Sequence, residues 1–145
     1  MISNVETMLS YFSQIRRVYA QEIHLRFKDE NFSPNEISIL ILLSNNTSIN
    51  TSSQLTLILG VSKGLISRSI DSLLSRGLIV CLPDTKDKRI QRIQLTKEAT
   101  PLLRRLQKEI EQINEILLQD ISEEEISQME TTMIKIIERF KKREV

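Results

Sequence analysis

Hydrophobic positions recur every three or four residues over long stretches at both ends of the chain. This spacing places them along one face of an α-helix. It predicts a long helix over residues 4–28, a second over residues 96–119 that its first threonine caps, and a last helix after Ser122. Pro101 falls early in the second helix, so the alternative is that its regular turns begin at Thr100.

Three shorter helices are predicted in the middle of the chain, and the first two have clear start signals. Ser33 and Thr51 are each followed three residues later by Glu or Gln, which is a capping box, and Pro34 suits a first helical position. The first helix is expected to end near Leu43 and the second at Gly60. Because a third helix follows after a short turn, the last two predict a helix-turn-helix unit, with an ordinary helical hairpin as the alternative.

The third of these helices, residues 62–76, has two faces of opposite character. Ser62 can cap its start, and Gly77 can end it. The face that is expected to be buried consists of Ile66, Ile70, Leu73 and Leu74. The other face is small, polar and basic, and it carries Lys63, Gly64, Ser67, Arg68 and Asp71. Such a face suits insertion into the major groove of DNA, and a solvated surface helix is the alternative.

A β-hairpin with a charged tip is predicted directly after this helix. Apolar residues 78–83 and a second run over 89–95 flank a polar turn, whose amides Asp84 and Asp87 can bind. Ile49 is expected to add a short strand beside the hairpin. Four basic residues stand on or near the tip, Lys86, Lys88, Arg89 and Arg92, and Arg89 can also pair with one of the two aspartates. A basic hairpin beside a basic helix predicts a winged helix whose wing contacts phosphates or the minor groove.

These residues resemble the MarR family of bacterial transcriptional regulators, and its SlyA-like members in particular. The segment 84–89, DTKDKR, is similar to the wing pattern D-x-R-D-[RK]-R of that family. The resemblance continues through residues 93–102 and 67–79, and with the order of the helices it extends over nearly the whole chain. Lys86 stands where the family usually has an arginine, so it keeps the charge but lacks the planar guanidinium fork.

The resemblance implies a homodimer. We expect this dimer to bind a pseudo-palindromic operator and to act as a repressor, with activation as the alternative. The amphipathic ends also require partner helices, from a second copy or, as the alternative, from a three-helix bundle within one chain. The DNA-binding residues are expected to be Ser62, Lys63, Gly64, Ser67, Arg68, Lys86, Lys88, Arg89 and Arg92. Dimerisation is expected to use Val5, Met8, Phe12, Ile113, Leu117, Met133, Ile137 and Phe140.

A ligand is also implied, because relatives in this family often bind small aromatic acids between their DNA-binding and dimerisation parts. A small aromatic or phenolic ligand would then release the DNA. The cleft would involve Phe12, Ile15, Arg16, Tyr19 and Ile41, with plain core packing as the alternative reading of these residues.

Composition places the chain among globular proteins, since 40% of its 145 residues are hydrophobic and 27% are charged. The net charge of +1 argues weakly against a nucleic-acid partner, but the charge is unevenly distributed. Residues 50–96 hold seven Lys or Arg against three Asp, whereas the remainder holds 13 against 16 acidic residues. A basic centre between acidic ends favours DNA binding. The absence of a membrane-spanning run, of a secretory signal and of a second cysteine predicts a cytoplasmic protein without a membrane partner.

Catalytic and metal-binding patterns are not found in the sequence. His24 has no neighbouring ligand residues and is expected at a surface or an interface. Cys81 lies in an apolar run and is expected to be a buried structural cysteine, and the first helix lacks the cysteine of peroxide-sensing relatives. We therefore expect no enzyme, no cofactor and no metal.

Together these patterns predict a mainly α fold with a small β-hairpin wing, a winged helix-turn-helix with long terminal dimerisation helices. Residues 1–32 and 99–145 would form the dimerisation parts, and residues 33–98 the DNA-binding domain. The predicted function is that of a sequence-specific DNA-binding transcriptional regulator. The alternative is a winged-helix module that binds a protein and no DNA.

Overall fold

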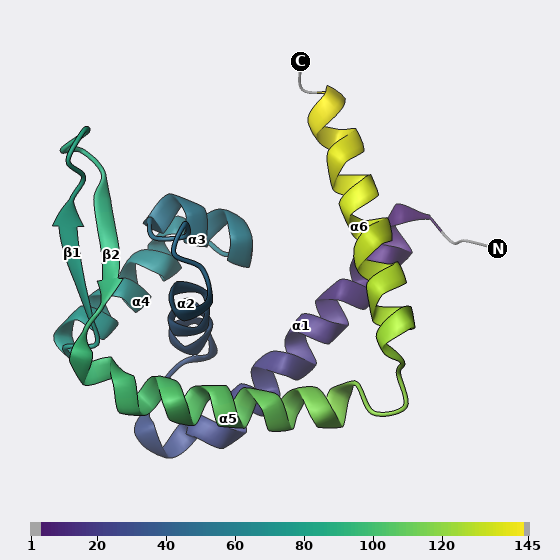
Figure 1. Cartoon of the computed structure of the whole chain (residues 1–145), viewed down its shortest axis with the longest axis horizontal. Coiled ribbons are helices and arrows are strands. Elements are labelled where there is room, and N and C mark those ends of the chain that lie inside the picture. Colours follow the sequence, from purple (N-terminus) through teal and green to yellow (C-terminus); the bar gives the residue numbers. More distant parts are fainter. Residues whose placement is uncertain (1–3, 144–145) are drawn as a thin grey trace. The chain divides into compact units, whose positions relative to one another are not determined.

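The computed structural model describes residues 4–143, and within them the chain is mainly helical with one antiparallel hairpin (Figure 1). The helices are α1 (Val5–Phe27), α2 (Pro34–Asn45), α3 (Ser52–Leu59), α4 (Lys63–Ser75), α5 (Thr100–Leu117) and α6 (Glu123–Arg143), with short 3-10 helices η1 (Lys28–Glu30) and η2 (Lys97–Ala99). The strands are β1 (Ile79–Pro83) and β2 (Gln91–Leu95). The predicted winged helix-turn-helix class with long terminal helices is confirmed. The chain divides into two compact units, the first ending at Ile113 and the second beginning at Asn114.

The predicted start signals of the three central helices are all used. The Ser33 hydroxyl accepts a hydrogen bond from the Glu36 amide, and the Glu36 carboxylate accepts one from the Ser33 amide, both at 3.2 Å. Thr51 and Gln54 form the same reciprocal pair at the start of α3, at 3.1 and 3.2 Å. The Ser62 hydroxyl accepts from the amide of the third residue of α4 at 3.2 Å. Each bond satisfies an N–H group that the first turn of a helix leaves free.

The core of the first unit is built around α2. Ile37, Ile39 and Leu40 are fully buried, and because α2 is apolar on most sides it has the character of a core helix. The other large, fully buried apolar side chains come from α1, α3, α4, α5 and β1, and they are Ile23, Phe27, Leu55, Ile66, Leu73, Ile79, Leu106 and Ile113.

The buried face of α4 is narrower than predicted. Ile66, Ile70 and Leu73 are buried as expected, but Leu74 is 37% exposed. Successive helical residues are about 100° apart around the axis, so Ile66, Ile70 and Leu73 fall within about 60° of one another and Leu74 lies beyond the edge of that face. The prediction was wrong at Leu74.

The hairpin pairs Ile79 with Leu95 and Cys81 with Ile93. The Ile93 amide also donates a hydrogen bond of 2.7 Å to the backbone carbonyl of Asn50 on the segment before α3. The short strand predicted at Ile49 is not formed, because the chain makes this single bond to β2 rather than a ladder; the sheet in residues 4–143 has two strands.

Left-handed glycines end α3 and α4, as predicted, with φ of 63° at Gly60 and 72° at Gly77. The predicted cap at Thr96 was wrong. Its hydroxyl donates to the Gly77 carbonyl at 2.6 Å and so closes the base of the hairpin instead. The short helix η2 follows, and the regular α5 begins at Thr100, which was the alternative expectation.

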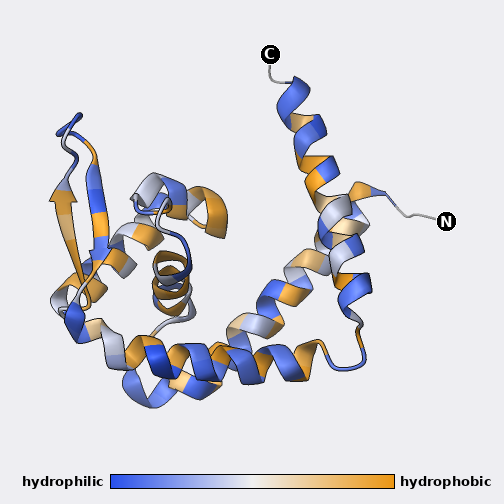
Figure 2. Ribbon diagram, viewed as in Figure 1, coloured by the Kyte–Doolittle hydropathy of each residue, from blue (hydrophilic) through white to orange (hydrophobic). Residues whose placement is uncertain are grey.

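The terminal helices bury few side chains within the single chain. In α1 the buried residues are Ile23 and Phe27, both near its end, and in α6 there are none. Hydrophobic positions nevertheless recur along both helices between hydrophilic ones (Figure 2). A capping box precedes α6, since the Glu125 amide donates to the Ser122 hydroxyl at 3.1 Å and the Ser122 amide donates to the Glu125 carboxylate at 2.8 Å. Within residues 4–143, none of the helices combines the length and the apolar character that a membrane crossing needs.

Candidate nucleic-acid interface

The exposed face of α4 carries all the residues predicted for its DNA-binding side. Ser62, Lys63, Gly64, Ser67 and Arg68 are exposed. None of the ion pairs formed within residues 4–143 involves Lys63 or Arg68. Both charges therefore remain available to an external anion.

Contacts on the opposite side of α4 hold this helix in place. The carboxylate of Glu36, which is only 7% exposed, accepts a hydrogen bond of 3.0 Å from the Ser72 hydroxyl. At the end of α4, the Arg76 guanidinium stacks on the Phe32 ring, 4.1 Å from its centroid, and donates to two backbone carbonyls before α2 at 3.0 and 2.7 Å. Sequence reasoning missed these anchors, because they join residues 36 to 46 positions apart.

The turn at the tip of the hairpin is organised by its two aspartates, as predicted. The Asp84 carboxylate accepts from the amides of Lys86 and Asp87 at 3.1 and 3.0 Å, and the Asp87 carboxylate accepts from the Arg89 amide at 3.1 Å. The bond from the Asp87 amide, followed by that from the Arg92 side chain, holds the pKa of Asp84 below its usual value. The Arg89 side chain is the largest cause of the lowered pKa of Asp87.

The four basic residues of the wing fall into two classes. Arg89 forms a two-bond ion pair with Asp87, at 3.1 and 3.2 Å. The Arg92 Nε donates to Asp84 at 3.0 Å, and its Nη1 donates to the Asn50 side-chain oxygen at 2.9 Å. Lys86 and Lys88 are exposed and take part in no ion pair within the described chain. The alternative role predicted for Arg89, pairing with one of the two aspartates, is therefore formed. The partners of Arg92 were not predicted, and of the four residues only the two lysines have no ion-pair partner within residues 4–143.

A pocket of about 190 Å³ lies between α4 and the hairpin, and residues of both elements line it. Lys63, Ser67 and Asp71 line it from α4, and Cys81 and Gln91 line it from the strands. The exposed face of α4 therefore lies directly beside the wing. Cys81 is only half-buried, so the expectation of a buried cysteine was wrong. Burial, and secondarily the charge of Asp71, raise the pKa of its thiol, which favours the less reactive protonated form.

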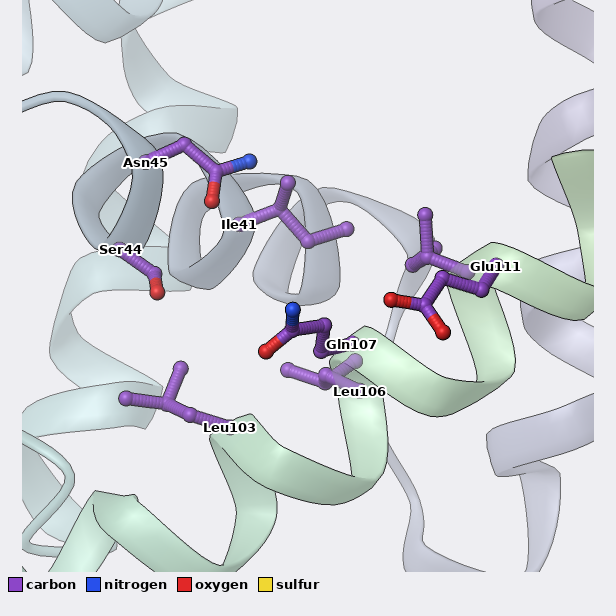
Figure 3. Close-up of a pocket in the computed structure, with 8 residues that line it drawn as sticks. Ile41, Ser44, Asn45, Leu103, Leu106, Gln107 and Glu111 are labelled. Atoms are coloured by element: carbon purple, nitrogen blue, oxygen red, sulfur yellow. The ribbon is translucent and has the colours of Figure 1, made fainter.

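The residues predicted for a ligand cleft do not share one pocket. Arg16 and Tyr19 line a small pocket of about 110 Å³ with residues of α2 and the turn after α3. Burial is the larger cause of the raised pKa of Tyr19, and Arg16 opposes it. Ile41 lines a separate pocket of about 410 Å³ between α2 and α5, and Figure 3 shows Gln107 reaching toward it from α5. Phe12 and Ile15 are exposed on α1 and line neither pocket.

Metal-ligating residues do not gather in the part of the chain that the structure describes: no three His, Cys, Asp or Glu side chains there converge on a common point. His24 is exposed in the last turn of α1.

An exposed basic helix held on a helix-turn-helix scaffold, with a basic hairpin beside it, defines a winged helix-turn-helix protein. The comparison with family models gives a match over the centre of the chain. Residues 32–91, which extend from just before α2 to the first residue of β2, match the model of the MarR family. The chain thus carries a MarR-family domain, and the predicted resemblance is confirmed.

Solved structures with the same fold are transcriptional regulators by name. The transcriptional regulator PA3341 is 23% identical to this chain with a TM-score of 0.80, and the match covers 96% of this chain and 99% of that one. A MarR transcriptional regulator from Methanosarcina mazei Go1 is 22% identical with a TM-score of 0.75, covering 94% and 98%. The transcriptional regulator SlyA is 20% identical with a TM-score of 0.75, covering 94% and 95%.

Proposed function

We propose that this protein is a sequence-specific DNA-binding transcriptional regulator, acting in the cytoplasm as a repressor and not as an enzyme. The observation that carries this proposal is the placement of unpaired cations on two adjacent elements. Lys63 and Arg68 on α4, and Lys86 and Lys88 on the wing, are exposed and make no ion pair within residues 4–143. Phosphate oxygens and base edges of duplex DNA are the partners that such an arrangement fits.

The two elements have different tasks in this proposal. The face of α4 enters the major groove, where Arg68 reads a guanine through a bidentate contact that is worth about 1–3 kcal/mol of discrimination. Lys86 and Lys88 contact phosphates, which adds affinity that depends on salt but not on sequence. Gly64 leaves room for close approach on the same face, because nothing in the structure lies within 4 Å of the position its Cβ would take.

The terminal helices support a homodimer. Within the single chain α6 buries none of its residues, and Val5, Ile137 and Phe140 are 59%, 52% and 61% exposed. Such apolar side chains are stabilised when a second copy covers them. A dimer would present two α4 helices to a pseudo-palindromic operator, with half-sites roughly 34–36 Å apart.

Release by a small ligand is part of the proposal, and a pocket between α2 and α5 has a suitable size. The pocket at Ile41 measures about 410 Å³ and is lined by both α2 and α5. Its volume lies within the roughly 300–1,000 Å³ that small-molecule sites occupy. The pocket lies between α2, which packs against α4, and α5, whose last residues belong to the second unit. A phenolic acid bound there can therefore favour one spacing of the two α4 helices.

Gel-shift titrations of two variants test the division of tasks. Arg68→Ala is expected to lose about tenfold to a hundredfold in preference for operator over random duplex, because one base contact disappears. Lys88→Ala is expected to weaken both complexes alike and to lower the slope of log affinity against log salt by about one. The reverse pattern contradicts these assignments. Wild-type protein that does not bind random duplex even at low salt contradicts the proposed function and favours a protein-binding winged helix.

A further inference from the structure

A chain of hydrogen bonds connects the wing to the start of the helix-turn-helix through Asn50. This residue precedes the cap of α3, and its amide donates to the Gln54 side chain at 2.8 Å. Its backbone carbonyl accepts from the Ile93 amide in β2 at 2.7 Å, and its side-chain oxygen accepts from Arg92 at 2.9 Å. Asn50 therefore joins α3 to both the backbone and a side chain of the second strand.

The Arg92 guanidinium extends the connection to the tip of the wing. Its Nε donates to Asp84 at 3.0 Å, and Asp84 in turn accepts from the amides of Lys86 and Asp87. The charge of Arg92 is thereby matched by a carboxylate, and two of its donor groups are occupied. The side chain is 35% exposed, whereas that of Arg89 is 92% exposed. The backbone amide of Lys86 is thus connected to Asn50 through the side chains of Asp84, Arg92 and Asn50 itself. The Gln54 side chain then connects Asn50 to α3.

We propose that Asn50 and Arg92 are positioning residues that hold Lys86 and Lys88 at a set orientation to α4. Arg92 then acts through Asp84 and not by contacting DNA itself. A planar guanidinium is suited to this task, because it presents two donors in fixed directions to two acceptors. A two-stranded hairpin alone is marginally stable, so its tip needs such a brace if two lysines are to meet phosphates together. The inference rests on the proposed function, since it says how the wing of that interface is held.

The salt dependence of DNA binding separates positioning from direct contact. Asn50→Ala removes no charge, so a residue without a positioning role would leave the slope of log affinity against log salt unchanged. If Asn50 positions both lysines, the slope is expected to fall by about one to two, as though cations had been removed. Arg92→Lys keeps the charge but loses the fork, and it is expected to lower the slope similarly. Asn46→Ala is the matched control, because Asn46 belongs to the same loop and donates only to the Leu42 carbonyl.

A second measurement does not depend on DNA. Amide hydrogen exchange of residues 84–90 is expected to accelerate at least threefold in Asn50→Ala and in Arg92→Lys, and to stay unchanged in Asn46→Ala. The double variant is expected to exchange no faster than either single variant, because both act through one connection. If Asn50→Ala does not fold, Arg92→Lys carries both measurements.

The outcomes distinguish this inference from the proposed function. Unchanged exchange and an unchanged salt slope in both variants, with wild-type protein that binds DNA, overturn the brace and leave the function standing. Accelerated exchange in a protein that does not bind DNA keeps the brace as a structural device but removes its role in recognition. Accelerated exchange together with a lowered slope supports both.

Discussion

The central helix α2 and the terminal helix α6 differ in how far their apolar side chains are buried within one chain. In α2, Ile37 and Leu40 are fully buried within the chain, whereas in α6 Ile137 and Phe140 are more than half exposed. The sequence pattern already separates the two helices, because α2 is apolar on most sides whereas α6 has one apolar stripe between charged residues. The difference shows that the centre of the molecule can fold on its own contacts, while the ends need a surface that one chain does not supply.

The largest effect on stability is expected when a buried side chain in the central core is truncated. Leu40→Ala should lower the free energy of unfolding by about 2–5 kcal/mol, because it removes a fully buried side chain and leaves a cavity. Leu57→Ala is the matched control, since Leu57 is 84% exposed on α3, and its effect should stay within about 0.5 kcal/mol. Urea unfolding monitored by circular dichroism measures both. Similar losses in the free energy of unfolding in the two variants would contradict the difference in burial between Leu40 and Leu57.

A charge on α6 is expected to act on assembly and not on the fold of the chain. Ile137→Glu should raise the dissociation constant of the dimer at least tenfold, about 1.4 kcal/mol, because a carboxylate would have to be desolvated in an apolar interface. Sedimentation velocity over a range of concentrations measures this shift. Leu57→Glu introduces the same charge on an exposed leucine outside the terminal helices and should leave assembly unchanged. A monomeric wild-type protein would refute the dimer itself.

Local signals in the sequence predicted the central fold well. The caps at Ser33, Thr51 and Ser62 join residues three positions apart, so chain geometry alone brings the partners together. The exposed face of α4 was predicted from local information too, because helical periodicity places Lys63 and Arg68 on the side opposite the apolar residues.

Contacts between distant residues could not be read in this way. The bond from Arg92 to Asn50 joins residues 42 positions apart, and that from Thr96 to Gly77 joins residues 19 apart. The sequence therefore predicted a DNA contact for Arg92 and a helix cap for Thr96, although each side chain has a tertiary partner. Cys81 was misjudged for a related reason, because an apolar run does not reveal which side of a two-stranded hairpin is covered.

Substitutions at two glycines separate effects on the stability of the fold from effects on operator binding. The expected changes in the free energy of unfolding are about 1 kcal/mol. Gly64→Ala should stabilise the protein by up to about 1 kcal/mol, because alanine is the better helix former and its Cβ meets nothing within 4 Å. The same methyl group should weaken operator binding if this face enters the groove. Gly77→Ala should instead destabilise by about 1–2 kcal/mol, because φ is 72° there. Thermal unfolding and gel shifts separate the two. Tighter operator binding by Gly64→Ala would place this face outside the groove.

The smallest effect is expected from acid, and it concerns the wing alone. The pKa values of Asp84 and Asp87 are lowered in the folded chain, chiefly by the Asp87 amide at Asp84 and by the Arg89 side chain at Asp87. A carboxylate whose folded pKa is depressed stabilises the fold at pH values above its unfolded pKa. The ordinary pKa of an aspartate is 3.8, and the pKa values of both residues in the folded chain are lower. Their contribution to stability is therefore lost as the pH falls below 3.8 and passes through the folded-state pKa values.

The tip of the hairpin should therefore keep its order from neutral pH down to about pH 4 and loosen below it, while α2 stays protected over the same range. Amide exchange of Lys86 and Arg89 measures the loosening. Asp84→Asn keeps an oxygen that can accept the two turn amides but cannot titrate, so the tip of this variant should respond less to acid. An equal acid response in the variant and in the wild-type protein would show that the Asp84 charge does not hold the tip. The difference in acid sensitivity between the wing and the core around α2 would then have another cause.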